Sequence, residues 1–315
     1  MGGADEIGAG PLRLAPISGV SRDGRPLAYH RAPAPDLAPW IARLYVTEVW
    51  QPQDQQIACG IFNDLPLLRV LVAGDWSAQT ANGPFHANSG ALLFGPHTHR
   101  MPVTVRGPFS TFGLALRPGA LAALRPDWAA AAADTVLRLE PADAWGIWAR
   151  IEDFHAHPPE YWLGKLEDWM RGLVAERGSP LPDPLAAAFD HAVLLDPATP
   201  IAAFAEARGV STRRVERMAR RDFGMTPRHV MRRARVLDMA SQILGLADRE
   251  EAHEHALRFY DQSHLIRDFR ALLGCTPRQL ARSPQPMLAL SLEPRQARRL
   301  EELGKLDGAA RAPWR

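Results

Sequence analysis

The sequence predicts an α+β protein, with a β-rich N-terminal barrel or sandwich followed by an all-α C-terminal part. Short apolar runs separated by turn residues fill the first part, apolar residues at helical spacing fill the second, and one motif occurs twice near the C-terminus. A chain of 315 residues suffices for about two domains of roughly 150 residues each. Hydrophobic residues make up 46% of the chain, which is enough to build a core in both parts.

The strands are expected between Trp40 and Leu116. The stretches LLRVLVAGDWSAQT, GALLFGP, MPVTVRG and FSTFGLAL are short apolar or alternating runs, divided by Gly, Pro and Asn-Gly. Several short strands with regular turn signals are typical of a small barrel or sandwich. The residues before them, 1–35, are rich in Gly, Pro and Ala without periodicity, so we expect a flexible arm there.

The chain is expected to turn helical after the strands. DAWGIWARIEDF and YWLGKLEDWMRGLVAERG carry apolar residues at three- and four-residue spacing, which predicts amphipathic helices. The stretch GSPLPDP, residues 178–184, is the best candidate for a linker. We therefore predict a β-rich domain with trailing helices over 36–177, a helical domain over 185–283 and a tail helix over 284–315.

Positive charge is concentrated in one segment, although the formal net charge of the whole chain is only +2. Residues 209–235 hold nine arginines against two acidic residues, Glu216 and Asp222. A block of this kind is often only a solvated face, but its charge density also suits the binding of phosphates.

Several classes of protein are disfavoured by what the sequence lacks. No run of about 18 apolar residues occurs, so no membrane span is expected, and the first residues do not resemble a signal peptide. Cys59 and Cys275 suggest neither a disulfide framework nor a metal site. There is no glycine-rich phosphate loop and no Gly-x-Ser-x-Gly motif, so we predict no catalytic residue and no cofactor. The expected location is the cytoplasm.

Residues 201–223 have the pattern of a helix-turn-helix unit. IAAFAEAR is a short amphipathic stretch, Gly209 allows a left-handed turn after it, and Ser211 is a good N-cap for the helix TRRVERMARRDF. The side chains expected to be buried on that helix are Val215, Met218 and Ala219, and those expected to be exposed are Arg213, Glu216, Arg217 and Arg220. The second helix of such a unit enters the major groove of DNA, where arginine can bond guanine.

A second copy of this unit is expected about 50 residues further on. The motif Gly-x-Thr-Pro-Arg occurs at residues 224–228 and again at 274–278, and Asp261 matches Ser211 as a cap. Gln262, Ser263 and His264 then occupy the first turn of the second recognition helix, where short polar side chains can reach base edges or phosphates. The intervening stretch PRHVMRRARVLDMASQIL would make a helix of about 27 Å, comparable with the roughly 34 Å of one DNA turn.

The two units together resemble the DNA-binding domain of the AraC/XylS family of bacterial transcriptional regulators. GVSTRRVERMARRDFGMTPRHVMRRARVLDMA and YDQSHLIRDFRALLGCTPRQL are similar to its two characteristic stretches, and the resemblance covers residues 199–282. It implies seven helices, with two helix-turn-helix units joined by a long helix. GALLFGPHTH and FGLALRPGALAAL more weakly resemble the β-rich, cupin-like sensor domain found ahead of such modules.

The resemblance implies a sequence-specific regulator that activates or represses transcription by binding double-stranded DNA. In the family, the N-terminal domain commonly binds a small effector or mediates dimerisation, so an effector, a second copy of the chain and RNA polymerase are candidate partners. The residues assigned to DNA binding are Thr212, Arg213, Arg214, Glu216, Arg217 and Arg220 in the first unit, and Gln262, Ser263, His264 and Arg267 in the second.

Two alternatives remain at this point. The second unit departs from the family pattern, with Glu254 at a small apolar position and Arg258 at the turn glycine, so it could be an interaction module that no longer reads DNA. A cupin-like metal-dependent enzyme with an accessory helical domain would rest on His86, His97 and His99. The expected glutamate after the second histidine is absent there, and we predict no metal ligand.

Overall fold

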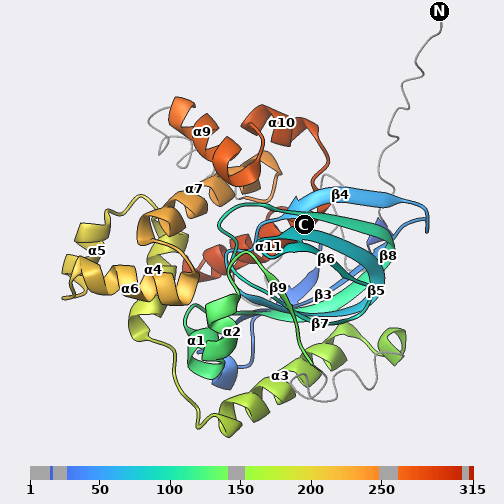
Figure 1. The fold of residues 1–315 in the computed structure, drawn as a ribbon, viewed down its shortest axis with the longest axis horizontal. Coiled ribbons are helices and arrows are strands. Elements are labelled where there is room, and N and C mark those ends of the chain that lie inside the picture. Colours follow the sequence, from blue (N-terminus) through green and yellow to red (C-terminus); the bar gives the residue numbers. More distant parts are fainter. Residues whose placement is uncertain (1–14, 17–26, 141–152, 248–261, 307–311) are drawn as a thin grey trace, which may run out of the picture.

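The computed structural model of the chain describes residues 15–16, 27–140, 153–247, 262–306 and 312–315. Within these ranges the N-terminal part forms a curled antiparallel sheet, and the C-terminal part forms helices that lie against one end and one side of it (Figure 1). This arrangement confirms the predicted α+β class, with strands first and an all-α part after them.

One antiparallel sheet contains the nine strands of the described residues, and β8 is its central strand. Their bounds are β1 Ala15–Pro16, β2 Tyr29–Arg31, β3 Ile41–Trp50, β4 Gln56–Ile61, β5 Leu67–Thr80, β6 Gly83–Ala87, β7 Gly90–Phe94, β8 Met101–Leu116 and β9 Val136–Arg138. The path of the sheet is β1-β3-β8-β5-β7-β9, while β2 pairs with β3, β4 with β8 and β6 with β5.

The strand β8 joins two stretches that the sequence predicts as separate strands. Its first half pairs with β4, its second half pairs with β3, and β5 runs along both halves on the other side. Gly107 lies between the halves at a φ of 69°, a conformation that glycine adopts without steric strain. The pairing of β8 with β5 is irregular at this point, because its register shifts between Leu71 and Ala73 and between Ala73 and Asp75, and it resumes on both sides of Gly107.

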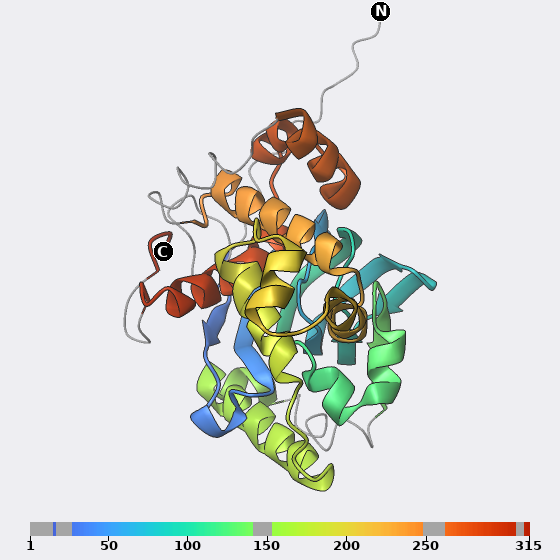
Figure 2. The same cartoon turned by 90° about the vertical axis from the view of Figure 1, so that its left-hand side faces the viewer.

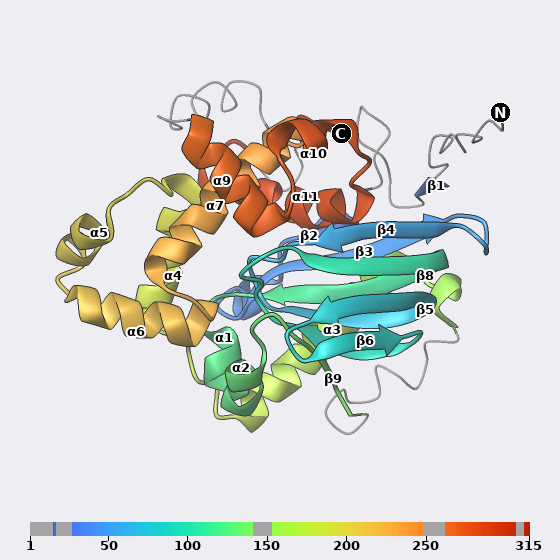
Figure 3. The ribbon, with the colours of Figure 1, turned by 45° about the horizontal axis from the view of Figure 1, so that its top comes forward.

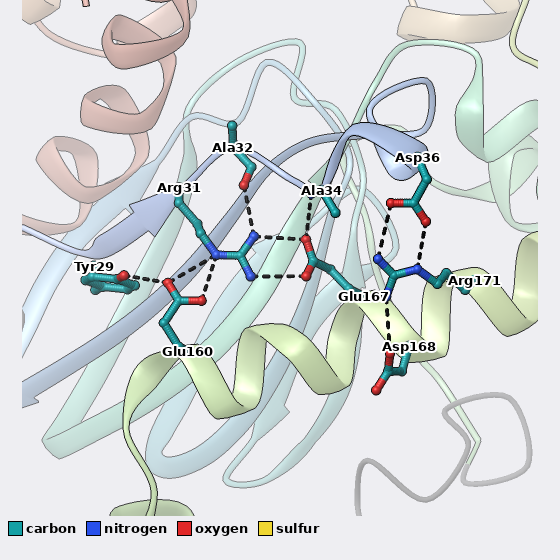
Figure 4. Close-up of polar contacts among 9 residues, drawn as sticks. All are labelled: Tyr29, Arg31, Ala32, Ala34, Asp36, Glu160, Glu167, Asp168 and Arg171. Carbon is teal, nitrogen blue, oxygen red and sulfur yellow. Dashed lines mark hydrogen bonds and ion pairs between the residues drawn. The ribbon is translucent and has the colours of Figure 1, made fainter. Parts of the chain in front are cut away.

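Residues 1–35 are predicted to be a flexible arm, but the last part of this segment is packed against the rest of the protein. Residues 29–31 form β2, and Leu27 is fully buried. Figure 4 shows the reason: Arg31 forms ion pairs of 2.9 Å with Glu160 and with Glu167 of the helix α3, Pro159–Glu176. The arm prediction is therefore wrong for this part, because the low periodicity of the segment did not reveal its long-range ion pairs.

The helices are described with the following bounds: the 3-10 helix η1 Pro35–Leu37, α1 Ala120–Leu124, α2 Pro126–Ala131, α3 Pro159–Glu176, α4 Pro184–Leu195, α5 Ile201–Ala207, α6 Thr212–Phe223, α7 Pro227–Ile243, α9 Gln262–Leu273, α10 Pro277–Arg282 and α11 Pro286–Glu302. The apolar face of α3, including Trp162 and Leu166, packs on one face of the sheet. No described helix combines the length and the apolar composition that a membrane crossing needs.

The C-terminal helices form two cores on either side of α7. One core joins α4, α5 and α6 to the first half of α7, and the other joins α9, α10 and α11 to its second half. Figure 2 shows α4 to α7, in yellow and orange, at the front of the molecule. The last helix, α11, turns back and lies between α7 and the sheet, where it contacts β3 and β4 (Figure 3).

Candidate nucleic-acid interface

The turn between α5 and α6 has the conformation that the sequence predicts. Gly209 has a φ of 63°, and Val210 packs against the core beside it. Ser211 caps α6, because its side chain accepts a hydrogen bond of 3.3 Å from the backbone N–H of Arg214. The left-handed glycine and the cap together determine the angle at which α6 leaves the turn.

The helix α6 presents a buried apolar face and an exposed basic face. Its buried side chains are Val215, Met218, Ala219, Asp222 and Phe223. Its exposed residues include Thr212, Arg213, Arg214, Glu216, Arg217 and Arg220, which are the six residues predicted to bind DNA in the first unit. Burial of the apolar stripe against α4, α5 and α7 therefore holds the basic face toward solvent.

Some arginines of α6 form ion pairs with acidic residues, and others form none within the described ranges. Arg214 pairs with Asp183 at 3.4 Å, and Arg221 pairs with Asp183 at 3.0 Å and with the buried Asp222 at 2.6 Å. Hydrogen bonding to Asp222 raises the pKa of Arg221 above its ordinary value. Arg213, Arg217 and Arg220 form no ion pair with any residue in the described ranges. These three guanidinium groups are therefore the ones in position to meet a new anionic partner.

The far end of α6 is fixed to the N-terminal part of the chain. Gly224 ends the helix with a φ of 72°, and a Cβ atom there would approach Ala133 Cβ to 3.1 Å and Pro96 Cγ to 3.5 Å. The short helices α1 and α2 also contact α6. The orientation of the basic face is thus set by both parts of the chain.

The second recognition helix is α9, which is described from Gln262 onward. Phe269 is fully buried in the second helical core, while Arg267 and Arg270 are exposed. Gln262, Ser263 and His264 form the first turn of α9, as predicted from the sequence. The cap Asp261 and the departures at Glu254 and Arg258 lie outside the described residues.

The helix α7 connects the two units and also contacts the sheet domain. Pro227 begins it, as the sequence predicts, and the side chain of Thr226 caps it. Arg233 is 1% exposed and donates to the carbonyl oxygens of His97 at 2.8 Å and Asp64 at 2.9 Å. Burial lowers the pKa of Arg233 to about 10, although Asp64 acts in the opposite direction. Through these hydrogen bonds the buried arginine connects α7 to the loops of the sheet.

The three histidines of the metal-enzyme alternative each have a different environment. His86 pairs with Asp75 at 2.5 Å, and His99 lies 3.8 Å from Asp134. His97 is completely buried and accepts a hydrogen bond of 3.1 Å from the backbone N–H of Asn63. Burial lowers the pKa of His97 to about 3, so this side chain is neutral at physiological pH. No group of three potential ligands that could hold a metal ion occurs within the part of the chain that the structure describes.

The interior of the curled sheet contains a cavity that sequence reasoning missed. Its empty volume is about 700 Å³ when the open mouth is included, and one wall of it is formed by α11. Arg69 in β5 lines it together with Tyr45 and Trp76. The signal was present in LLRVLVAGDW, because a single arginine within an apolar strand predicts a buried charge with a special environment.

Two family models match the chain. Residues 204–283 match a helix-turn-helix domain, and residues 29–138 match a domain of unknown function, DUF6597. With the capped basic helix described above, the first match places the protein in the class of helix-turn-helix DNA-binding regulators of transcription. Its helix-turn-helix region belongs to the AraC type, which confirms the resemblance found in the sequence.

Solved structures with some likeness to the chain include two forms of ToxT from Vibrio cholerae strain SCE256. An apo variant of ToxT is 11% identical, with 76% of this chain and 96% of that chain covered and a TM-score of 0.46. ToxT with a bound unsaturated fatty acid is 12% identical, with 75% and 94% covered and a TM-score of 0.43.

A third solved structure with some likeness is the AraC-like transcriptional activator CuxR. It is 15% identical to this chain, with 67% of this chain and 86% of that chain covered and a TM-score of 0.30. At these TM-scores the three likenesses assign neither a ligand nor a partner to this chain. A search of curated proteins gave no significant match.

Proposed function

We propose that this protein regulates transcription by reading a specific DNA sequence with α6, with α9 making a second contact on the same face of the duplex. In this proposal Arg213, Arg217 and Arg220 contact bases or phosphates. Thr212, Glu216 and the held Arg214 complete the first contact region. The second contact region consists of Gln262, Ser263, His264 and Arg267.

The observation that carries the proposal is the pair of opposite faces on α6. Val215 and Met218 are buried, whereas the guanidinium groups of Arg213, Arg217 and Arg220 face solvent without an ion-pair partner among the described residues. An arginine held on the exposed face of a capped helix can bond the O6 and N7 atoms of guanine in the major groove. This geometry supports α6 as the principal reading helix.

The length of α7 supports a two-site contact. Its 17 residues span about 26 Å, and both α6 and α9 pack against it. Two recognition helices held this far apart suit successive major grooves of one duplex, which are roughly 34 Å apart. Because Arg233 of α7 is bonded to the sheet domain, a change in that domain could alter the positions of both recognition helices.

The remaining parts of the proposal concern control and location. We propose that residues 36–177 act as the sensor, that residues 185–283 bind DNA and that residues 284–315 form a tail helix. A small effector bound at the sensor would control DNA binding, and a second copy of the chain and RNA polymerase are the proposed protein partners. The role requires access to the chromosome, hence a cytoplasmic location, and it includes no catalytic step.

The experiment that tests this function is selection of fragments from genomic DNA by the purified full chain, followed by binding measurements at increasing salt. We expect a common sequence among the selected fragments. The log of the binding constant should fall linearly with the log of salt concentration, with a slope of about −0.9 per phosphate contacted. Selection of no common sequence together with binding that does not depend on salt would disprove the proposal.

A further inference from the structure

The cavity in the curled sheet is closed by a helix from the other end of the chain. The strands β3, β5 and β8 line one part of it, and α11 supplies Met287, Leu290, Ser291, Pro294, Arg295 and Arg298. The helix α11 follows the two helix-turn-helix units in sequence and lies beside the sheet (Figure 3). The cavity is therefore lined by both the sheet domain and the C-terminal part. A molecule bound here would contact both parts at once.

Arg69 is the unusual residue of this cavity. It is 8% exposed, yet it forms no ion pair with a carboxylate of any residue that the structure describes. Its guanidinium carbon lies 4.8 Å from the ring centre of Phe94 and 5.1 Å from that of Trp76, and its Nε donates to the Tyr45 hydroxyl at 3.2 Å. Aromatic rings offset part of the cost of burying a cation, but they do not neutralise its charge.

Several buried hydrogen-bond donors of the cavity lining have no partner in the described part of the chain. Arg69 Nη1, Arg295 Nη2, Arg298 Nη1 and the side-chain nitrogen of Asn63 all lack a hydrogen-bond partner among the described residues, and all four residues line the cavity. Asp64 is the one carboxylate among the lining residues, and it pairs with Arg295 at 3.1 Å. Buried donors normally have a partner, so these four nitrogens are in position to receive an acceptor, and the unpaired charge of Arg69 favours an anionic one.

The other lining residues indicate what the rest of such a molecule should be. Ile61, Leu65, Leu67 and Phe109 are apolar, as are Met287 and Leu290 on the side of α11. Ligand cavities of this composition bury an apolar body and orient it through a few polar groups.

We propose that this cavity binds a small organic anion, a carboxylate with an aromatic or aliphatic body, and that Arg69 receives its charged group. Arg298 and Arg295 approach the same ligand from α11. The inference rests on the proposed function, because it names the class of effector that the sensor takes. It also identifies α11, the helix after the DNA-binding units, as the element that senses it.

The same two arginines connect α11 to the DNA-binding part by ion pairs. Arg298 Nη2 bonds Asp190 of α4 at 2.6 Å, and Arg295 pairs with Asp238 of α7. A carboxylate that recruits Arg298 or Arg295 would compete with these two acidic residues. Ligand binding would thereby alter how α4 and α7, and with them α6 and α9, are held.

The test measures thermal unfolding and calorimetric binding of the full chain with phenylacetate and octanoate. Phenylacetamide and octanamide serve as uncharged probes of nearly the same shape. The variants are Arg69→Met, which removes the charge, Arg69→Lys, which keeps it, and Arg106→Met, which removes an exposed arginine of β8 outside the cavity lining. Binding of the unliganded proteins to the selected DNA is measured in parallel.

We expect at least one carboxylate to raise the unfolding temperature of the wild type and of Arg106→Met, and its amide to have little effect. Arg69→Met should bind that carboxylate roughly 30-fold more weakly or worse, and Arg69→Lys should retain part of the affinity. Equal binding of acids and amides, unchanged binding by Arg69→Met, or no binding of either carboxylate would overturn the inference. DNA binding by the same proteins would then leave the proposed function intact, whereas its absence would contradict that function separately.

Discussion

Arg298 of α11 and Asp190 of α4 form an ion pair of 2.6 Å in the interior, where each side chain is 5% exposed. The two residues are 108 positions apart in the sequence. The contact holds the first helix of the C-terminal part and the last described helix of the chain together beside the sheet. Because both charges are removed from water, loss of either residue alone should strongly destabilise the folded protein.

Replacement of one partner should therefore be much more costly than replacement of both. Asp190→Leu leaves a buried guanidinium without its carboxylate and should lower the free energy of unfolding by about 3–5 kcal/mol. The double variant Asp190→Leu with Arg298→Met should recover much of that loss, because no charge remains to be neutralised. Urea unfolding of the wild type, both single variants and the double variant checks this; additive single effects would show that the pair is not coupled.

The cap of α6 can be tested independently of DNA. Ser211→Ala removes the acceptor for the backbone N–H of Arg214 and should destabilise the protein by about 1 kcal/mol. Ser77→Ala on the exposed side of β5 is the matched control and should change stability by less than about 0.5 kcal/mol. If urea unfolding gives the same small effect for both, the side chain of Ser211 does not cap the helix in solution.

Two buried arginines should respond in opposite ways to the same substitution. Arg233→Met leaves the carbonyl oxygens of His97 and Asp64 without a donor and should cost about 1–3 kcal/mol. Arg69→Met removes a buried charge that has no carboxylate partner among the described residues, so we expect little loss or a gain of stability without ligand. Thermal unfolding of both variants decides this, and a large loss for Arg69→Met would contradict the account of its environment.

The lowered pKa of His97 should make the stability of the protein depend on pH. Burial, the largest effect, lowers its pKa from 6.5 to about 3, so the unfolded chain takes up a proton in this range that the folded protein does not. Stability should therefore fall as the pH is lowered from about 6.5 toward 3, by up to about 1.4 kcal/mol per pH unit from this residue. His97→Asn, whose amide oxygen can still accept from Asn63, should lose that part of the dependence. An unchanged pH profile of urea unfolding in this variant would refute the assignment.

The helix-turn-helix part was predictable because its signals are local. Gly209, Ser211 and the spacing of Val215 and Met218 specify the turn, the cap and the buried face within about four helical turns of sequence. The strand β5 was predicted with its observed bounds for the same reason, since its apolar run ends at turn residues. The basic face of α6 followed from this periodicity alone.

The contacts that sequence reasoning missed join residues far apart in the chain. Nothing near Arg31 predicts Glu160 and Glu167 as its partners, and nothing near Arg298 predicts Asp190. The tail helix was expected, but its role as a wall of the cavity depends on tertiary packing against β3 and β4. Arg69 was visible as a charge in an apolar strand, yet only the fold shows that the residues around it are aromatic.

The central claim, that the exposed basic face of α6 reads DNA, is tested most directly by one comparison on a selected operator fragment. Binding of the wild type is measured beside Arg217→Ala and beside Arg177→Ala, an exposed arginine just after α3 that serves as the control. We predict that Arg217→Ala loses about 1–3 kcal/mol of binding free energy and discriminates less between bases at one position, while Arg177→Ala binds as the wild type does. Equal affinity and equal specificity of all three proteins would contradict the claim.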